Sequence, residues 1–281
     1  MNTAVLLINC PDKKGIVASV SDFIFKNRGN ILHADEHLDP ELDLFLMRIE
    51  WNLDKFLLTR PEFEKKFSKI AVKFKMDWKV EYAESLQKAA VFVSSQTHCL
   101  SDLLYRYKSL ELNCEIGLII SNHEEAKPLA DFYGIPFYYI PSVDKVKAES
   151  EALKLLKKNN TQLIILARFM QILSPGFVKK YKNKIINIHH SFLPAFIGAK
   201  PYHQAFERGV KLIGATAHYV THDLDRGPII EQDTVRISHR DTVSDLVQKG
   251  KDLEKVVLSR AVKWHLENRI LTYSNKTVVF C

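Results

Sequence analysis

The sequence predicts an α/β protein of two domains, the first with an antiparallel sheet and the second with a mostly parallel sheet. Up to residue 83, apolar positions follow strand or helical spacing in the order βαββαβ. From residue 89 onward, short strands that are apolar throughout alternate with helices, which is typical of a parallel sheet covered on both faces. We therefore predict domains at 1–83 and 89–281, joined by a polar linker at 84–88.

The first domain is predicted from alternation, helix signals and turns. Gly29 ends the first helix, and Pro61 lies near the start of the second, as these residues commonly do. Two alternating segments around a turn at Asp39–Asp43 indicate an antiparallel strand pair. The order predicts a four-stranded antiparallel sheet with both helices on one face. The expected strands are 3–10, 30–40, 42–51 and 76–82, and the expected helices are 13–29 and 60–75.

The second domain is predicted from five short apolar strands and the helical stretches between them. In sheets of this kind, ligands bind beyond the carboxyl ends of the strands, so we search for the site there. The expected strands are 89–95, 114–121, 136–141, 162–167 and 184–188, and the clearest helices are 100–111 and 145–159.

Composition limits the function classes. The net charge is +7, but the lysines are dispersed among apolar positions as on solvated helix faces, so we expect no nucleic-acid binding. No apolar run reaches the ~18 residues of a membrane span, and the N-terminus reads as a strand rather than a signal peptide. The four cysteines form no CxxC pair, which fits a reducing cytoplasm.

Polar side chains gather after the apolar strand 184–188. Asn187 and His189 are two apart on an extended segment, so they share a face while His190 points away. A second segment, "GATAHYVTHDLDRGPII", carries His218, His222 and Asp225 around a turn. The apolar loop "LARFMQILSPGF" is able to wall a flat ligand.

An amide, an imidazole and a carboxylate suit carbonyl chemistry. The amide can donate to a developing oxyanion, the imidazole can move a proton, and the carboxylate can orient the imidazole or accept a proton. The sequence has no GxSxG motif and no cysteine near these segments, so water or an external amine is the expected nucleophile.

The segment "NIHHSFLPAFIGAKPYHQAFERGVKLIGATAHYVTHDLDRGPIIEQD" resembles the catalytic core of the 10-formyltetrahydrofolate-using enzymes. The resemblance implies a Rossmann-like formyltransferase domain, a cis Leu193–Pro194 bond and no metal or permanently bound cofactor. It implies 10-formyltetrahydrofolate as substrate. The implied catalytic residues are Asn187, His189 and Asp225, with Ser191, His218 and His190 in supporting positions. The implied substrate-binding residues are Phe169, Met170, Gln171 and Leu173, to which we add His222.

Two differences from the transformylase sequence pattern indicate which of these enzymes the chain resembles most. Glycinamide ribonucleotide transformylases cradle an acceptor phosphate in a glycine- and serine-rich loop, whereas this chain has bulky His98 and Leu100 there. His190 and "GAKPY" resemble the deformylases, which release formate by hydrolysis in one-carbon and purine metabolism. We also expect His190 either to help exclude a bulky amine acceptor or to form a hydrogen bond across the pocket.

The first domain resembles an ACT (ferredoxin-like) domain through "DKKGIV" and "GNI". This resemblance implies a homo-oligomer and a small amino-acid effector bound near Asp12, Gly15 and Asn30, with a purely assembling role as the equal alternative.

Three other functions are considered. A metal-dependent hydrolase would use His189, His218, His222 and Asp225, but residues i and i+4 of a strand lie about 13 Å apart. A formyltransferase would use an acceptor other than water. A folate-binding or amino-acid-sensing protein would have an inactive core, although the catalytic trio is present.

Overall fold

The structure is a computed structural model that describes residues 2–84, 86–194 and 201–280. It divides into two compact units between Leu86 and Gln87. The C-terminal segment is shared, because Asn268–Leu271 groups with the first unit and Thr272–Thr277 with the second.

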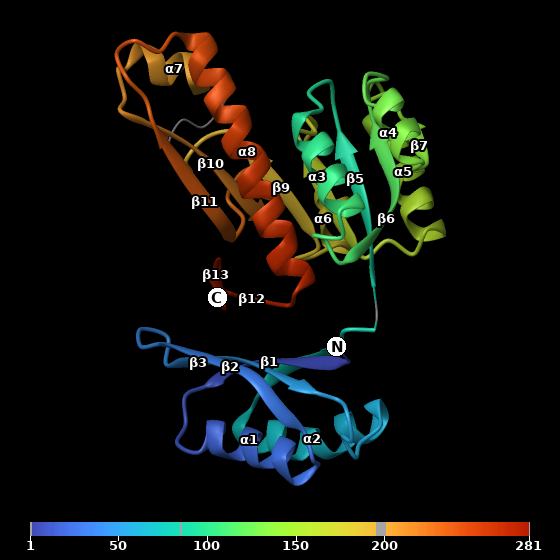
Figure 1. Cartoon of the computed structure of the whole chain (residues 1–281), viewed down its shortest axis with the longest axis vertical. Helices are drawn as coiled ribbons and strands as arrows, with labels where there is room; N and C mark the ends of the chain where they lie inside the picture. Colours follow the sequence, from blue (N-terminus) through green and yellow to red (C-terminus); the bar gives the residue numbers. More distant parts are fainter. Residues whose placement is uncertain (1, 85, 195–200, 281) are drawn as a thin grey trace. The chain divides into compact units, whose positions relative to one another are not determined.

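The first unit is a four-stranded antiparallel sheet with strand order β2-β3-β1-β4. Helices α1 and α2 lie side by side on one face of this sheet (Figure 1). The predicted βαββαβ arrangement is confirmed. Its elements are β1 (Thr3–Pro11), α1 (Ile16–Lys26), β2 (Asn30–Asp39), β3 (Leu44–Asn52), α2 (Arg60–Phe74) and β4 (Asp77–Tyr82).

Aromatic packing holds the helices of the first unit to its sheet. Trp51 stacks on Phe63 with ring centroids 5.3 Å apart, and Phe63 stacks on Phe67 at 5.5 Å. All three side chains are fully buried, and each contributes roughly 1.5–3 kcal/mol of burial free energy or more. A capping box of Thr59 and Glu62 starts α2.

The second unit is a seven-stranded mixed sheet with strand order β11-β10-β9-β8-β5-β6-β7. Strands β5 to β9 pair with one another in parallel, as predicted, whereas β10 and β11 are antiparallel. The strands of this unit, with the C-terminal hairpin, are β5 (Gln87–Val93), β6 (Cys114–Ser121), β7 (Phe137–Tyr139), β8 (Leu163–Ala167), β9 (Ile185–His189), β10 (Leu212–Tyr219), β11 (Ile229–Arg236), β12 (Ile270–Tyr273) and β13 (Lys276–Val279).

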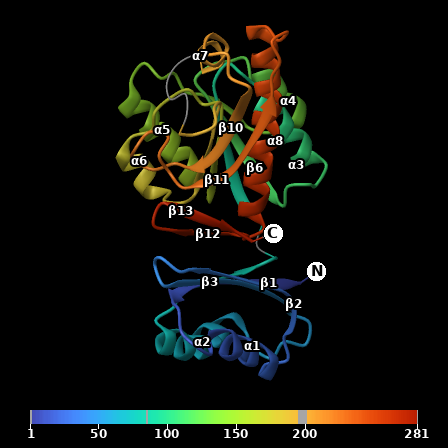
Figure 2. The ribbon, with the colours of Figure 1, turned by 90° about the vertical axis from the view of Figure 1, so that its left-hand side faces the viewer.

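Helices cover both faces of the large sheet. Figure 2 shows α3 and α8 on one face and α5 and α6 on the other. Phe92 and Ile164 of the sheet pack with Leu156 and Phe177 from α5 and α6 in one buried cluster. The helices are α3 (His98–Lys108), α4 (Lys127–Tyr133), α5 (Lys145–Lys158), α6 (Pro175–Lys180), α7 (Pro201–Glu207) and α8 (Val243–Leu266).

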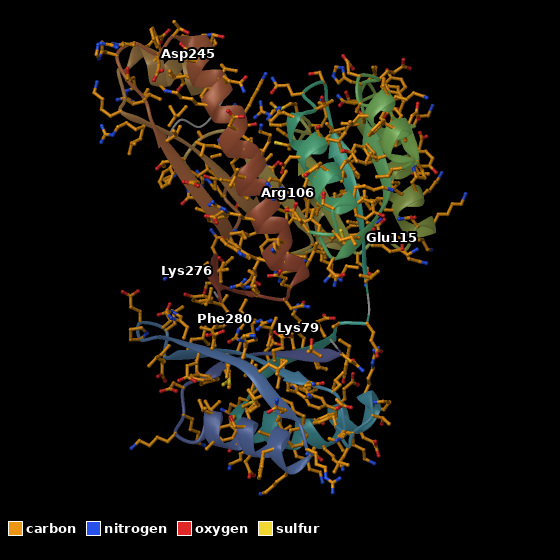
Figure 3. The ribbon with its side chains drawn as sticks, in the orientation of Figure 1. Lys79, Arg106, Glu115, Asp245, Lys276 and Phe280 are labelled. Carbon is orange, nitrogen blue, oxygen red and sulfur yellow. The ribbon has the colours of Figure 1, made fainter. Side chains whose placement is uncertain are left out.

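The longest helix, α8, begins at a capping box. Asp245, labelled in Figure 3 at that end of the helix, accepts hydrogen bonds from the backbone and the hydroxyl of Thr242. The capping box fixes the start of a helix whose middle turns carry Glu254 into the interior. Across the described ranges 2–84, 86–194 and 201–280, none of the helices has the length and hydropathy of a membrane span.

Candidate active site

Asn187 and His218 face each other because β9 and β10 are antiparallel. The register pairs His218 with Asn187 and Thr216 with His189, so all four side chains share one face of the sheet. Asn187 Nδ2 lies 3.2 Å from His218 Nε2. His218 Nδ1 lies 3.0 Å from the carbonyl oxygen of Tyr219, which can only accept, so Nδ1 carries a proton. His218 Nε2 is thereby turned towards the Asn187 amide nitrogen.

Asp225 reaches the same face from the loop that follows β10. Its backbone φ of 54° is left-handed, a conformation that Asp tolerates better than most residues. Two residues later the loop passes very close to β10, because a Cβ on Gly227 would lie 1.7 Å from the carbonyl oxygen of Tyr219. A glycine is therefore needed at this position for the loop to bring Asp225 back over the strand.

Asp225 pairs with two imidazoles. Its Oδ2 lies 3.3 Å from His189 Nδ1 and its Oδ1 lies 3.6 Å from His218 Nε2. Burial alone would raise the pKa of Asp225, but the hydrogen bonds and charges of His189 and His218 together hold it well below its usual value. Asp225 is thus ionised at neutral pH and can accept a hydrogen bond from His189 Nδ1.

Because Nδ1 of His189 contacts Asp225, Nε2 is the ring nitrogen that can act on a ligand. With its proton on Nδ1, the neutral ring carries a lone pair on Nε2. Nε2 is buried and has no hydrogen-bond partner among the residues that the structure describes. An unpartnered nitrogen of this kind, held by an ionised carboxylate, suits proton transfer to and from a bound substrate.

These groups line a cavity of about 340 Å³, within the range of small-molecule sites. The predicted substrate-binding residues Phe169, Met170, Gln171, Leu173 and His222 line the same cavity. Met170, Ile172 and Leu224 at this cavity are 58%, 60% and 58% exposed. Large apolar side chains that face solvent around a polar centre indicate a site for a ligand with a flat apolar ring.

The predicted orientation of His190 is wrong. Strand alternation would send His190 to the opposite side from His189, yet its ring centroid lies 5.2 Å from that of His189 and it lines the same cavity. Strand β9 ends at His189, so alternation no longer applies to the next residue. Burial, and then the charges of Arg168 and His189, lower the pKa of His190 to about 4, so its ring is neutral at physiological pH.

The other predicted residues lie outside the centre of the site. Ser191 is buried, and its carbonyl oxygen accepts from Thr216, so it anchors the loop after β9. The Leu193–Pro194 bond is cis, as predicted. Within "GAKPY", residues 198–200 lie outside the described residues. Asp12, Gly15 and Asn30 are exposed in the first unit, and Gly15 has a positive φ of 92°.

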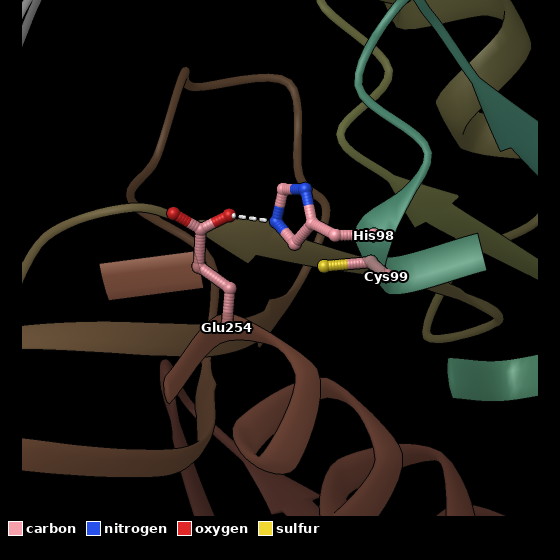
Figure 4. A group of neighbouring side chains, drawn as sticks. All are labelled: His98, Cys99 and Glu254. Atoms are coloured by element: carbon pink, nitrogen blue, oxygen red, sulfur yellow. Dashed lines mark hydrogen bonds and ion pairs between the residues drawn. The ribbon is translucent and has the colours of Figure 1, made fainter. Parts of the chain in front are cut away.

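The set of four proposed metal ligands does not converge. His222 is 73% exposed on its side chain and pairs with Asp223 instead. In the part of the chain that the structure describes, only His98, Cys99 and Glu254 bring three potential metal ligands together (Figure 4). Figure 4 shows His98 already hydrogen-bonded to Glu254, at 2.8 Å.

The sequence reasoning missed Arg168. This residue lines the cavity, is 8% exposed and lies 3.4 Å from Glu254 through its Nε. The available signal was a single charged residue in an otherwise apolar loop directly after the buried strand β8. Glu254 also accepts a 2.7 Å hydrogen bond from Tyr202, so the carboxylate has partners from three segments.

Comparisons with known proteins agree on one kind of enzyme. A family model described as formyl transferase matches residues 87–262. A formyltetrahydrofolate deformylase of Synechocystis sp. is 55% identical over 280 residues, which cover 99% of this chain and 98% of that protein. The crystal structure of a formyltetrahydrofolate deformylase from Pseudomonas syringae pv. tomato has a TM-score of 0.97 and 47% identity, and the match covers 100% of this chain and 95% of that one.

A transferase matches less of the chain. The phosphoribosylglycinamide formyltransferase from Anaplasma phagocytophilum has a TM-score of 0.65 and 31% identity. That match covers 69% of this chain and 94% of the transferase. The similarity to deformylases thus extends over both units, whereas the similarity to this transferase does not.

Proposed function

The chain belongs to the family of formyltetrahydrofolate deformylases, and on that premise we propose that it hydrolyses 10-formyltetrahydrofolate at Asn187, His189 and Asp225. The reaction yields tetrahydrofolate and formate. The observation that carries the residue assignment is the buried His189 in a cavity that Asn187 also lines. Its Nδ1 contacts Asp225, and its Nε2 has no partner in the described part of the chain.

The proposed mechanism begins with attack of water on the formyl carbon. His189 Nε2 takes a proton from the water, and Asp225 stabilises the imidazolium across the 3.3 Å contact. The formyl oxygen becomes an oxyanion and accepts from an amide N–H of Asn187.

The second half of the mechanism expels the folate nitrogen. The C–N10 bond breaks as His189 Nε2 returns its proton to N10, which leaves tetrahydrofolate and formic acid. Formic acid then loses its remaining proton and becomes formate. Every proton in this scheme moves through His189 or to solvent, so no step calls for a metal.

We assign the pterin ring to the wall formed by Phe169, Met170, Gln171 and Leu173, with His222 at the rim. The partly exposed apolar side chains on this wall support the assignment because a flat ring would remove them from water.

The test is hydrolysis of 10-formyltetrahydrofolate with no acceptor added. Tetrahydrofolate is followed by absorbance and formate is quantified separately. Equal amounts of both products, unchanged by a chelator, support the proposal. Turnover that starts only when an amine or ribonucleotide is supplied would make the protein a transferase and contradict it.

We propose further that the first unit is an ACT domain that binds an amino acid near Asp12, Gly15 and Asn30 and assembles the chain into a homo-oligomer. The exposed positions of these residues and the open edges of the sheet at β2 and β4 support this. Equilibrium dialysis with each amino acid tests effector binding, and sedimentation of the full chain tests the oligomer.

The buried thiols of Cys10, Cys99 and Cys114 support a cytoplasmic location, and we place formate supply to one-carbon and purine metabolism there.

A further inference from the structure

Arg168 is an unusual residue for its position. It follows β8 directly, at the edge of the sheet where ligands bind, and it lines the same cavity as His189 and Asn187. Its backbone φ is 62°, in the left-handed region, where a non-glycine residue is strained by roughly 1 kcal/mol. Ser94 holds this turn, because its N–H donates to the carbonyl oxygen of Arg168 and its hydroxyl accepts from Met170 N–H.

The guanidinium of Arg168 is only partly paired. Its Nη1 is buried and has no hydrogen-bond partner within the described residues. The contact of Nε with Glu254 is 3.4 Å and does not have hydrogen-bond geometry. Glu254 instead accepts from His98 at 2.8 Å and from Tyr202 at 2.7 Å. A buried donor on a charged group is costly to leave unpaired, so it marks a place for an acceptor.

The cluster does not suit a cation. His98, Cys99 and Glu254 bring three potential ligands together, but the positive charge of Arg168 lies against the same carboxylate. Burial, followed by the charge of Glu254, raises the pKa of the Cys99 thiol and keeps it protonated. The unsatisfied group of the cluster is therefore an N–H donor on the positively charged Arg168, which favours an anion as its partner.

The chemistry of hydrolysis supplies such an anion. When an amine accepts the formyl group, the product is a neutral amide. When water accepts it, the product is formic acid, which loses a proton and becomes the carboxylate formate. Arg168 lines the cavity, and its guanidinium has an N–H without a partner among the described residues, so it matches the product of hydrolysis and not the product of transfer.

We propose that Arg168 is the formate-binding residue of this enzyme and holds the product carboxylate through Nη1 while tetrahydrofolate leaves. This inference rests on the proposed function, because only a hydrolase makes formate. Glu254, fixed by His98 and Tyr202, moderates the charge of Arg168 so that formate is held weakly enough to depart.

The experiment measures product inhibition of 10-formyltetrahydrofolate hydrolysis by sodium formate, against sodium chloride at equal ionic strength. Three enzymes are compared: the wild type, Glu254→Gln, and the double variant Arg168→Met/Glu254→Gln. The double variant removes both charges, so it leaves no buried carboxylate unpaired and avoids the main risk of misfolding. Inhibition by tetrahydrofolate is measured in the same enzymes as the control for the folate site.

Removing the carboxylate of Glu254, and then also the guanidinium of Arg168, should change the inhibition constant for formate in opposite directions. Glu254→Gln leaves the charge of Arg168 uncompensated, so the inhibition constant for formate should fall severalfold below that of the wild type. In the double variant the inhibition constant for formate should be about tenfold or more above that of Glu254→Gln, because one charge-assisted hydrogen bond to formate is lost. The constant for tetrahydrofolate should stay within about twofold in both, because neither variant changes a side chain of the ring wall.

If a variant turns over too slowly for inhibition to be measured, formate binding is measured instead by the shift in unfolding temperature. Formate should raise the unfolding temperature of Glu254→Gln more than that of the double variant, since a ligand stabilises only the state that binds it. Equal formate effects on Glu254→Gln and the double variant, in both assays, would overturn the inference. So would formate and tetrahydrofolate constants that change together. Absence of hydrolysis in the wild type would instead refute the proposed function itself.

Discussion

Replacing Asp225 with Asn tests the geometry of the site most directly. The substitution keeps the shape of the side chain but removes the charge that faces His189 Nδ1 at 3.3 Å. Two unit charges at this distance interact by about 5 kcal/mol at an effective dielectric constant of 20. This energy is available only when His189 is protonated, in the transition state, so its loss should lower kcat by roughly 10³- to 10⁴-fold.

The assay is tetrahydrofolate release from 10-formyltetrahydrofolate at saturating substrate, with circular dichroism to confirm the fold. Asp223→Asn is the matched control, because Asp223 is on the same loop, lines the same cavity and pairs through its carboxylate with the exposed His222. An exposed pair of this kind contributes about 0–1 kcal/mol, so the control should lose no more than a fewfold. If Asp225→Asn retains turnover within tenfold of the wild type, Asp225 does not support a protonated His189 and the mechanism is wrong.

Three further predictions concern single positions in or beside the site. Asn187→Ala should lower kcat by about 10²- to 10³-fold with a smaller change in KM, because it removes an oxyanion donor; steady-state kinetics will show whether KM changes instead. Gly227→Ala should destabilise the fold by at least ~1–3 kcal/mol in urea unfolding, since its Cβ would lie 1.7 Å from the carbonyl oxygen of Tyr219. His190 has a folded pKa of about 4, below its unfolded value, so its unfolded form binds the proton first and the stability of the fold should decline as pH falls from about 6.5 to 4. His190→Gln should flatten this decline, and an unchanged pH profile of the unfolding free energy would contradict the assignment.

The sequence predicted the fold and much of the site because short-range rules apply to them. The apolar strands of the second unit, flanked by helices, led to a parallel sheet, and the edge rule for such sheets led to Asn187 and His189. The spacing of these two residues by two placed them on one face, which the register of β9 and β10 bears out.

Other parts of the site depend on long-range placement that spacing does not encode. His190 joins the cavity because β9 ends one residue earlier, and strand ends are poorly defined by sequence. In the sequence, Arg168 is a single charged residue in an apolar loop. Its contact with Glu254 depends on α8, which is far away in the sequence. The pairing of His218 with Asn187 follows from an antiparallel strand in a sheet expected to be mostly parallel.

The loop from Thr221 to Asp225 both walls the cavity and carries its carboxylate. Leu224, 58% exposed, immediately precedes Asp225, so a ring that packs against Leu224 also steadies the backbone that aims Asp225 at His189. We therefore expect recognition of the ring to be linked to reactivity at the formyl group. Simple formamides, which lack the ring, should enter the site and still react poorly even at saturation, because their binding gives Leu224 and the backbone of Asp225 no added support. The folate moiety would in that sense act as an activator of the enzyme as well as a carrier of the formyl group.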